Sequence, residues 1–579
     1  MEAMLLLTPS AAFFGLKLNS RVLSSASVLK IMVYHIMITA NRPRLVKGAR
    51  LFPGVLLVVA AAVSSAQDAA SVFLKGPYLQ GPGTDTMTIK WEAPLNKPAI
   101  LHYGNNGNAD QESRVEGPHP LKAVMSTSVT NVVYLYEARL TNLRPGSVYT
   151  YWAEIDRVRS ARKKFKTFEV QQPKVTFIAY GDARTNPKMH LAVASNFKRY
   201  SPDFILHTGD LVGDGRRYDA WGRDFFGPLA DVIDEIPMLH SIGNHEQDGN
   251  NYLFYLGLPG KDRWYSYDIG PVHVVALDFR LPTGNDEQFA FARQDLMSSK
   301  APWKVVFMHF PVFNIGGHFT HWGHAAYLPL FHQAKVDLVL TGHSHIYERF
   351  RPIAASSGTD SWPIMHITTG GGGAGLYSVL PHPALASFYS TNHFVVLEAT
   401  ASTLKGRTFN INNILLDSFE VRKENGQLSA EYLAQVYPEE ALKLTYDAAP
   451  SLTASLASAP RTNSAAQAMF TIRPMKGMGQ SVQLEIDLTP ASRKYYQLEG
   501  GPLRVTAPAS AEPEKVVWAR VRAAGDGIGI DGRGTELLSP ALIFQGRIKL
   551  GAVETLTYGQ RSRVTDAAAE AAKKLEAPK

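Results

Sequence analysis

The chain contains no cysteine among its 579 residues. Disulfide bonds, thiol nucleophiles and thiolate metal ligands are therefore excluded, while an oxidising compartment would find nothing to oxidise. No long low-complexity segment indicates disorder. The apolar run at residues 51–63 has 13 residues, which is too short to span a bilayer comfortably, so no stable membrane span is expected.

The charge of the chain is concentrated at its beginning. The formal net charge is +8, but residues 1–66 hold seven basic residues against Glu2 alone, so that only +2 remains beyond them. No stripe of basic and aromatic residues follows. The sequence therefore predicts no specific nucleic-acid partner.

Residues 1–66 have the order of a secretory signal peptide. The basic stretch "NRPRLVKGAR" precedes the apolar run, and the small residues Ser64 and Ala66 stand before Gln67. This order predicts cleavage near Ala66 and a secreted or periplasmic protein. A retained membrane anchor is the alternative. The residues before Met37 fit no signal pattern, so translation is expected to start at Met37.

A chain of this length is expected to form several domains, and its composition changes twice. Short strand-like runs at 67–170 predict a β-sandwich in which Trp91 and Tyr151 are core aromatics. Alternating strands and helices at 171–423 predict an α/β domain. A Ser-, Ala- and Pro-rich linker and further strand-like runs predict a β-rich domain at 424–562, before a tail at 563–579.

Polar side chains directly follow the apolar runs of the α/β region. Taken singly, each such residue is more typical of a turn, a helix cap or a hydrogen-bonded core histidine. Five such segments in order, after five predicted strands, instead favour a metal site, because carboxylates, an amide oxygen and imidazoles suit Zn, Fe or Mn. The predicted ligands are Asp182, Asp210, Asn244, His309, His343 and His345.

This set resembles the calcineurin-like metallophosphoesterases, and within them the purple acid phosphatases. The resemblance covers about residues 72–423. "KGPYLQ" and "LRPGSVYTY" look like the fibronectin-III-like domain of that family, and "VDLVLTGHSHIYER" looks like its last site segment. The resemblance implies a central ββ-sandwich flanked by helices, and it does not reach the β-rich region after residue 424.

The resemblance also implies two metal ions. Asp182, Asp210 and His345 would bind the first ion. Asp210, Asn244, His309 and His343 would bind the second, so that Asp210 bridges the pair. His343 and His345 would then bind different ions.

The sequence departs from the family pattern at two positions. Gly213 stands where purple acid phosphatases have a tyrosine that binds ferric iron and gives the colour, and Arg184 stands where many other members have a histidine. An iron-tyrosinate colour is therefore not expected, and the metal pair stays open. Tyr218 is a possible replacement for the missing ligand.

The expected function is hydrolysis of phosphate monoesters on a small phosphorylated substrate, by attack of a metal-bound hydroxide. His245 is the first candidate for the acid that protonates the leaving group, and His318 is the second. Arg184 is expected either to clamp a phosphate oxygen or to form a local salt bridge. Glu246 and Glu348 would orient ligand histidines or pair at the surface.

Two alternatives to the monoesterase stay open. One is a phosphodiesterase on the same metals. The other is a non-catalytic cell-envelope binding protein on a phosphatase scaffold. The sequence indicates no oligomeric state.

Overall fold

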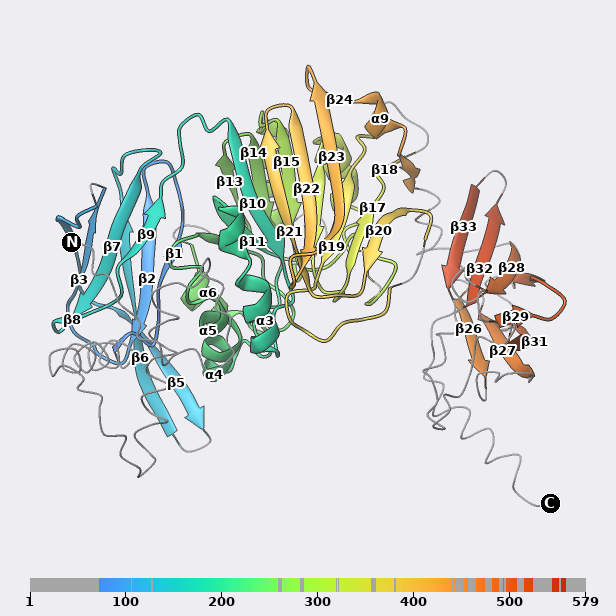
Figure 1. Cartoon of the computed structure of the whole chain (residues 1–579), viewed down its shortest axis with the longest axis horizontal. Helices are drawn as coiled ribbons and strands as arrows, with labels where there is room; N and C mark the ends of the chain where they lie inside the picture. Colours follow the sequence, from blue (N-terminus) through green and yellow to red (C-terminus); the bar gives the residue numbers. More distant parts are fainter. Residues whose placement is uncertain are drawn as a thin grey trace, which may run out of the picture. The chain divides into compact units, whose positions relative to one another are not determined.

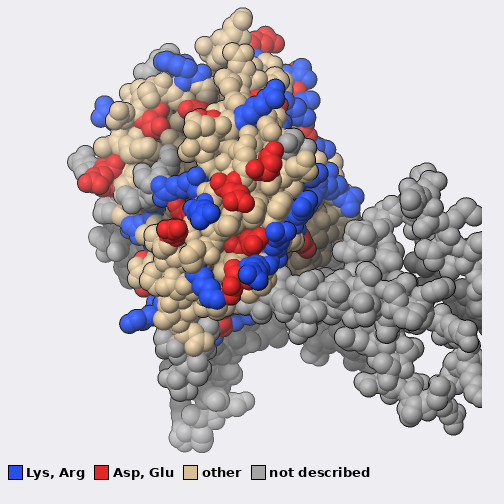
Figure 2. Space-filling view, turned by 90° about the vertical axis from the view of Figure 1, so that its left-hand side faces the viewer, with Lys and Arg blue, Asp and Glu red and all other residues tan. Residues whose placement is uncertain are grey.

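The computed structural model describes residues 72–105, 107–126, 129–258, 263–281, 286–318, 320, 322–355, 361–379, 382–439, 442, 451–456, 465–473, 482–488, 493, 496–507, 515–523, 544–550 and 553–558. The predicted signal segment and the predicted tail lie outside these ranges, so both stay predictions. Within the described ranges, no helix has the length and apolarity needed to cross a membrane. On the face shown in Figure 2, basic and acidic side chains are interspersed rather than gathered by sign.

The first part of the fold is a sandwich of two antiparallel sheets (Figure 1). Their strand orders are β1-β2-β6-β5 and β4-β3-β7-β8, with β9 paired to β7. Trp91 and Tyr151 are both fully buried in its interior, which confirms them as core aromatics. The strands are β1 (Lys75–Gln80), β2 (Met87–Ala93), β3 (Ala99–Gly104), β4 (Gln111–Val115), β5 (His119–Ser126), β6 (Val129–Leu140), β7 (Val148–Ile155), β8 (Val158–Arg159) and β9 (Lys163–Lys166).

Strand β2 is buried on both faces, and its second face meets the central domain. Ile89 and Trp91 point into the sandwich, whereas Glu92 receives hydroxyl hydrogen bonds of 2.7 Å from both Tyr218 and Tyr255. Lys75 lies 2.5 Å from the same carboxylate and 3.7 Å above the Tyr218 ring. The buried carboxylate is thus fully partnered, as a buried charge requires.

Replacing Glu92 by alanine is expected to destabilise the protein by about 3–5 kcal/mol, because Lys75 and two tyrosine hydroxyls lose their buried partner. Urea denaturation followed by tryptophan fluorescence measures the change. Glu112→Ala, at a half-exposed position on β4, is the matched control and should leave the midpoint unchanged. Equal midpoints for the two variants would show that Glu92 is not a stabilising partner.

The central part contains two seven-stranded sheets with the orders β12-β11-β10-β21-β22-β23-β24 and β13-β14-β15-β16-β19-β17-β20. In each sheet the strands that precede the predicted ligands run parallel to one another. The strands of the first sheet are β10 (Lys174–Tyr180), β11 (Phe204–His207), β12 (Met238–His240), β21 (His393–Thr400), β22 (Thr403–Asn410), β23 (Leu415–Glu424) and β24 (Gln427–Leu428). Those of the second are β13 (Tyr265–Ile269), β14 (Val272–Ala276), β15 (Trp303–Phe307), β16 (Leu338–Thr341), β17 (Tyr347–Phe350), β19 (Met365–Thr369) and β20 (Leu385–Tyr389).

The two sheets pack face to face and helices cover their outer faces. Helices α3 to α6, beside the first sheet, are labelled in Figure 1. In β10, Phe177 and Ala179 belong to the core between the sheets, whereas Ile178 and Tyr180 belong to the core beneath α3 to α6. Burial on both faces explains why these strands are continuous apolar runs in the sequence. The helices are α3 (Pro187–Ala194), η2 (Phe197–Tyr200), α4 (Tyr218–Ala220), η3 (Trp221–Phe226), α5 (Gly227–Leu229) and α6 (Asn250–Leu256) on the first sheet, and α7 (Glu287–Ser298) and α8 (Tyr327–Gln333) on the second.

His273 on β14 lies between two carboxylates, 2.8 Å from Asp268 and 2.7 Å from Asp295. Burial lowers its pKa, but the two carboxylates outweigh burial and raise the pKa above the ordinary value of 6.5. A raised histidine pKa stabilises the fold below the unfolded-state pKa, and the effect disappears as pH rises through the folded-state pKa.

His273→Gln is therefore expected to lower the free energy of unfolding by about 1–3 kcal/mol near pH 5.5 and by less near pH 9. Urea denaturation at the two pH values measures this difference. A loss that is the same at both would mean that the imidazole is not charged in the folded protein.

Strand pairing of the central sheets continues beyond residue 423, where we placed the end of the α/β domain. β24 extends the first sheet, and β25 (Tyr437–Pro438) pairs with β18 (Ile353–Ala354) after helix α9 (Ala430–Leu433). Two further four-stranded sheets follow, β26-β27-β31-β29 and β30-β28-β32-β33. Their strands are β26 (Ser451–Leu456), β27 (Ala465–Arg473), β28 (Val482–Leu488), β29 (Tyr496–Leu498), β30 (Leu503–Ala507), β31 (Lys515–Ala523), β32 (Phe544–Leu550) and β33 (Val553–Tyr558).

These sheets confirm the predicted fold class. An N-terminal β-sandwich precedes a central ββ-sandwich flanked by helices, and a β-rich region follows it. In β27, Phe470 and Ile472 are buried and alternate with more exposed residues such as Gln467, the period of a strand with one buried face.

Candidate metal centre

The six predicted metal ligands all lie just beyond the carboxyl ends of central strands. Asp182 follows β10, Asp210 follows β11 and Asn244 follows β12, all in the first sheet. His309 follows β15, and the "GHSH" histidines follow β16, in the second sheet. Because the two sheets pack face to face, these ends supply side chains to one place from both layers.

The backbone turns sharply at three of these residues. Asp182, Asp210 and His343 have positive φ values of 57°, 55° and 67°. This conformation is unfavourable for residues with a side chain, and it persists where the surrounding structure imposes it, often at functional sites.

The glycines that precede these residues serve mainly for close approach. Gly181, Gly209, Gly243 and Gly342 precede Asp182, Asp210, Asn244 and His343, and of these four glycines only Gly209 has a positive φ, of 94°. A Cβ atom on Gly243 would lie 2.2 Å from the backbone N of Asp210, and one on Gly342 would lie 2.5 Å from Asp182 Oδ2. Only glycine lets these backbone segments pack together.

The side chains form two groups that Asp210 connects. In the first group, His345 Nε2 lies 3.5 Å from Asp182 Oδ1. In the second, the amide oxygen of Asn244 lies 2.9 Å from His309 Nε2 and 3.1 Å from His343 Nδ1. Asp210 Oδ1 lies 3.3 Å from His309 Nε2, and ligand atoms of Asp182, Asp210 and His309 come within 4.8 Å of one another.

The donor set fits divalent or trivalent metal ions. Asp182 Oδ1 is buried and has no hydrogen-bond partner among the described residues, a state that is unfavourable unless a cation binds there. His309 Nδ1 lies 2.9 Å from the carbonyl of Thr208, and His345 Nδ1 lies 2.6 Å from that of Gly375. Each ring thus donates one N–H to a carbonyl and keeps Nε2 as a lone-pair donor for a metal.

The electrostatic environment keeps His343 and Asp210 in their metal-binding forms. Burial, followed by the neighbouring His309, lowers the pKa of His343 to about 3, so the imidazole is neutral. Burial acts to raise the pKa of Asp210, but His309, His245 and Arg184 outweigh it and hold the pKa below its ordinary value. Asp210 is therefore a carboxylate near neutral pH.

Arg184 lies at the edge of this set, in contact with both groups. Its Nε donates a 3.0 Å hydrogen bond to Asp210 Oδ2, and one terminal nitrogen lies 3.3 Å from His345 Nε2. The salt bridge, one of the two roles we expected, is thus present, and the guanidinium keeps other N–H donors for an anion.

His245 is held beside Asp210 by its backbone and by its ring. Its backbone N donates to Asp210 Oδ1 at 2.9 Å, and its Nδ1 lies 2.7 Å from the carbonyl of Gly213. Its Nε2 lies 4.0 Å from Asp210 Oδ2, and the side chain is 27% exposed. The second ring nitrogen is therefore open to a bound substrate.

His318 also lies at the ligand set. Its ring stacks on that of His343 with centroids 4.7 Å apart, and its Nε2 lies 2.8 Å from the hydroxyl of Tyr377. His324 instead packs on Phe313, with its Nε2 2.7 Å from the Val312 carbonyl. His321, close to His318 in the sequence, lies outside the described residues.

Tyr218 does not replace the missing tyrosine ligand. Its hydroxyl is bound to Glu92 of the sandwich, as described above. At the family's tyrosine position, the backbone N of Gly213 donates to Asp224 Oδ2 at 3.0 Å. The described residues thus supply no phenolate to this site.

Glu246 and Glu348 act on backbone groups rather than on ligand histidines or surface partners. Glu246 is fully buried and accepts hydrogen bonds from four backbone N–H groups, those of Asp210, Leu211, Val212 and Gly243. Burial and the charge of Asp210 raise its pKa, against the effect of these donors. Glu348 is also fully buried and accepts from the N–H groups of Ile315 and Gly316, so it fastens the loop that carries His318.

Tyr377 was missed by the sequence analysis. It follows a glycine-rich stretch and no periodicity marks it. Its ring stacks on His345 with centroids 4.5 Å apart and an interplanar angle of 14°. A lone tyrosine in a loop carries no sequence signal of such a contact.

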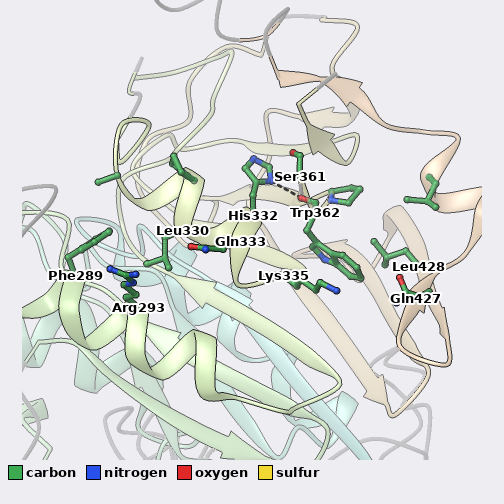
Figure 3. Close-up of a pocket in the computed structure, with 14 residues that line it drawn as sticks. Phe289, Arg293, Leu330, His332, Gln333, Lys335, Ser361, Trp362, Gln427 and Leu428 are labelled. Carbon is green, nitrogen blue, oxygen red and sulfur yellow. Dashed lines mark hydrogen bonds between the residues drawn. The ribbon is translucent and has the colours of Figure 1, made fainter. Parts of the chain in front are cut away.

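A separate cavity of about 1030 Å³ lies between α7, α8, β24 and α9 (Figure 3). Arg293, Lys335 and Trp362 are among the residues that line it. None of the lining residues is one of the predicted site residues. Its size alone therefore does not make it the site of the chemistry.

Comparisons with known proteins agree with this geometry. Residues 179–347 match the family model of the calcineurin-like phosphoesterases. Purple acid phosphatase 21 of Arabidopsis thaliana is 28% identical over 326 residues, covering 50% of this chain and 69% of the relative. Human acid phosphatase type 7 is 25% identical over 383 residues, covering 57% of this chain and 85% of the relative.

A solved structure shares the fold. The purple acid phosphatase PPD1 from yellow lupin seeds superposes with a TM-score of 0.52 at 18% identity, covering 63% of this chain and 78% of that one. Residues 179–347, which match the family model, contain every predicted metal ligand. Residues 179–347 are thus a calcineurin-like phosphoesterase domain, in a hydrolase homologous to the purple acid phosphatases.

Proposed function

We propose that the chain is a secreted or periplasmic enzyme that hydrolyses phosphate monoesters at a centre of two metal ions. The position of Asp210 carries this proposal. Its Oδ1 lies 3.3 Å from His309, in the group with Asn244 and His343, while its Oδ2 receives Arg184, which also contacts His345 of the other group. One carboxylate placed between two donor groups is suited to bridging two cations.

Asp182, Asp210 and His345 would hold the first ion, and Asp210, Asn244, His309 and His343 the second. When bound, the ions supply Lewis acidity, which neutralises phosphoryl charge and makes a water molecule more acidic. Imidazole, carboxylate and amide donors suit Zn, Fe or Mn. With Gly213 in place of the tyrosine, iron-loaded protein is expected to lack the tyrosinate colour.

The remaining site residues would act on the phosphate and on the leaving group. Arg184 has N–H donors beyond those used on Asp210 and His345, and these fit a phosphate oxygen. His245, with Nε2 open, and His318, next to His343, are the candidates for donating a proton to the leaving oxygen. His245 is favoured because the Gly213 carbonyl fixes its ring and its backbone N donates to Asp210.

Metal content and hydrolysis, measured together on the chain beginning at Gln67, test the proposal. The protein is supplied with Zn, Mn or Fe and assayed on p-nitrophenyl phosphate and bis-p-nitrophenyl phosphate. About two metals per chain and a preference for the monoester are expected. A preference for the diester would favour the phosphodiesterase alternative, and metal-free, inactive protein would favour the non-catalytic binding protein.

The compartment has its own test. The full chain is expressed in a bacterial host, and the N-terminus of the exported protein is sequenced. Recovery of protein that begins near Gln67 supports export with cleavage. Protein that stays in the membrane fraction with residues 51–63 attached would favour the retained anchor.

A further inference from the structure

His318 and Tyr377 form a connected pair above the two histidines of the "GHSH" segment. The His318 ring stacks on His343, with centroids 4.7 Å apart and an interplanar angle of 26°. The Tyr377 ring stacks on His345, with centroids 4.5 Å apart. A 2.8 Å hydrogen bond joins the Tyr377 hydroxyl to His318 Nε2. We call these two residues the cap pair.

The cap pair is built from two loops that are distant in sequence. Glu348 and Ser344 hold the His318 loop, since Glu348 accepts from Ile315 and Gly316 and the Ser344 hydroxyl accepts from the His318 backbone N at 3.0 Å. The Tyr377 backbone N donates to the His345 carbonyl at 3.2 Å. Both loops are thus fastened to the segment that carries the predicted ligands, which makes the pair a fixed part of the site.

The cap pair lies on the exposed side of the ligand set. His318 is exposed and Tyr377 is half-exposed, whereas Asp182, Asp210 and His309 are buried. Both members lie within electrostatic range of Arg184, Asp182 and Asp210. A phosphate held by this set must direct its ester substituents away from the buried ligands, toward the exposed residues.

We propose that the cap pair selects monoesters over diesters by occupying the space that a second ester substituent needs. A monoester has one substituent, which can leave beside His245. A diester has a second, which meets the stacked rings of His318 and Tyr377. This inference rests on the proposed function, because it assigns the substrate class of the same site to two named side chains.

Tyr377→Ala tests the proposal through the ratio of kcat/KM for bis-p-nitrophenyl phosphate to that for p-nitrophenyl phosphate. Removing the ring is expected to raise this ratio about tenfold or more, the scale on which steric exclusion of a group discriminates between substrates. Tyr377→Phe keeps the ring and loses only the hydroxyl, so a smaller rise is expected. His318→Ala should raise the ratio as well, although it also removes the second candidate acid.

Inhibition by inorganic phosphate separates this role from a merely structural one. Phosphate has no ester substituent, so its inhibition constant should be the same for the wild-type protein and for Tyr377→Ala. Tyr103→Ala, at a partly buried tyrosine of the sandwich, should change neither quantity.

Each outcome decides the matter. A raised ratio with unchanged phosphate inhibition supports the cap pair. If the wild-type protein is active and Tyr377→Ala has the same ratio of diester to monoester kcat/KM, the cap pair is overturned and the proposed function stands. The same holds if Tyr377→Ala shows weakened phosphate inhibition together with a general loss of activity. Metal-loaded wild-type protein that hydrolyses neither substrate overturns both.

Discussion

Asp210→Ala is expected to abolish phosphatase activity, with kcat/KM for p-nitrophenyl phosphate at least about 1000-fold lower, or about 4 kcal/mol less transition-state stabilisation. The carboxylate is buried and lies between the two donor groups, next to His309 and Arg184. Its removal takes a ligand from both proposed ions at once. Elemental analysis of the same sample should show fewer than two metals per chain.

Two further variants make this result specific. Asp214→Ala removes a carboxylate from the same loop, but that carboxylate binds the side chain of Arg216 at the surface, so activity and metal content should persist. Asp210→Asn keeps the shape of the side chain and removes its charge, and it should resemble alanine if bridging requires a carboxylate. Full activity in Asp210→Asn would contradict a bridging role.

The position of the ligand set could be predicted because the carboxyl ends of parallel strands lie at the same edge of a sheet. Parallel strands buried on both faces give unbroken apolar runs, and the polar residues at their ends must gather at one edge. Asp182 after "KVTFIAYG" and His309 after "WKVVFM" follow this rule. The "GHSH" pair was visible because residues two apart on an extended segment project to the same side.

The supporting residues could not be predicted because their contacts depend on the packing of loops. Glu246 was expected to orient a ligand histidine or to pair at the surface, but its carboxylate points back into the turn that carries Asp210. Glu92 is one acidic residue in an ordinary strand. Only its hydrogen bonds with Tyr218 and Tyr255 show that it connects the sandwich to the central domain. The stack of Tyr377 on His345 likewise depends on the path of a glycine-rich loop.

Glu246→Ala is expected to be among the most destabilising single substitutions in the central domain. Four backbone N–H groups, those of Asp210, Leu211, Val212 and Gly243, would lose their acceptor in a fully buried place. An unsatisfied buried donor costs about 1–3 kcal/mol, so the free energy of unfolding should fall by at least about 4 kcal/mol. Activity should fall too, since these bonds hold the turns that place Asp210 and Asn244.

The test measures the urea concentration at which half of the hydrolytic activity is lost. This midpoint reports the unfolding of the central domain alone, because a chain of several domains need not unfold in one step. Glu246→Gln keeps one amide oxygen as an acceptor but turns an NH2 group toward two N–H donors. Its urea midpoint should therefore lie between those of Glu246→Ala and the wild-type protein. Glu420→Ala, at an exposed glutamate of β23 paired with Arg422, should match wild type. A Glu246→Ala midpoint equal to that of Glu420→Ala would mean that the four N–H groups find other acceptors, and that the turn around Asp210 does not depend on this carboxylate.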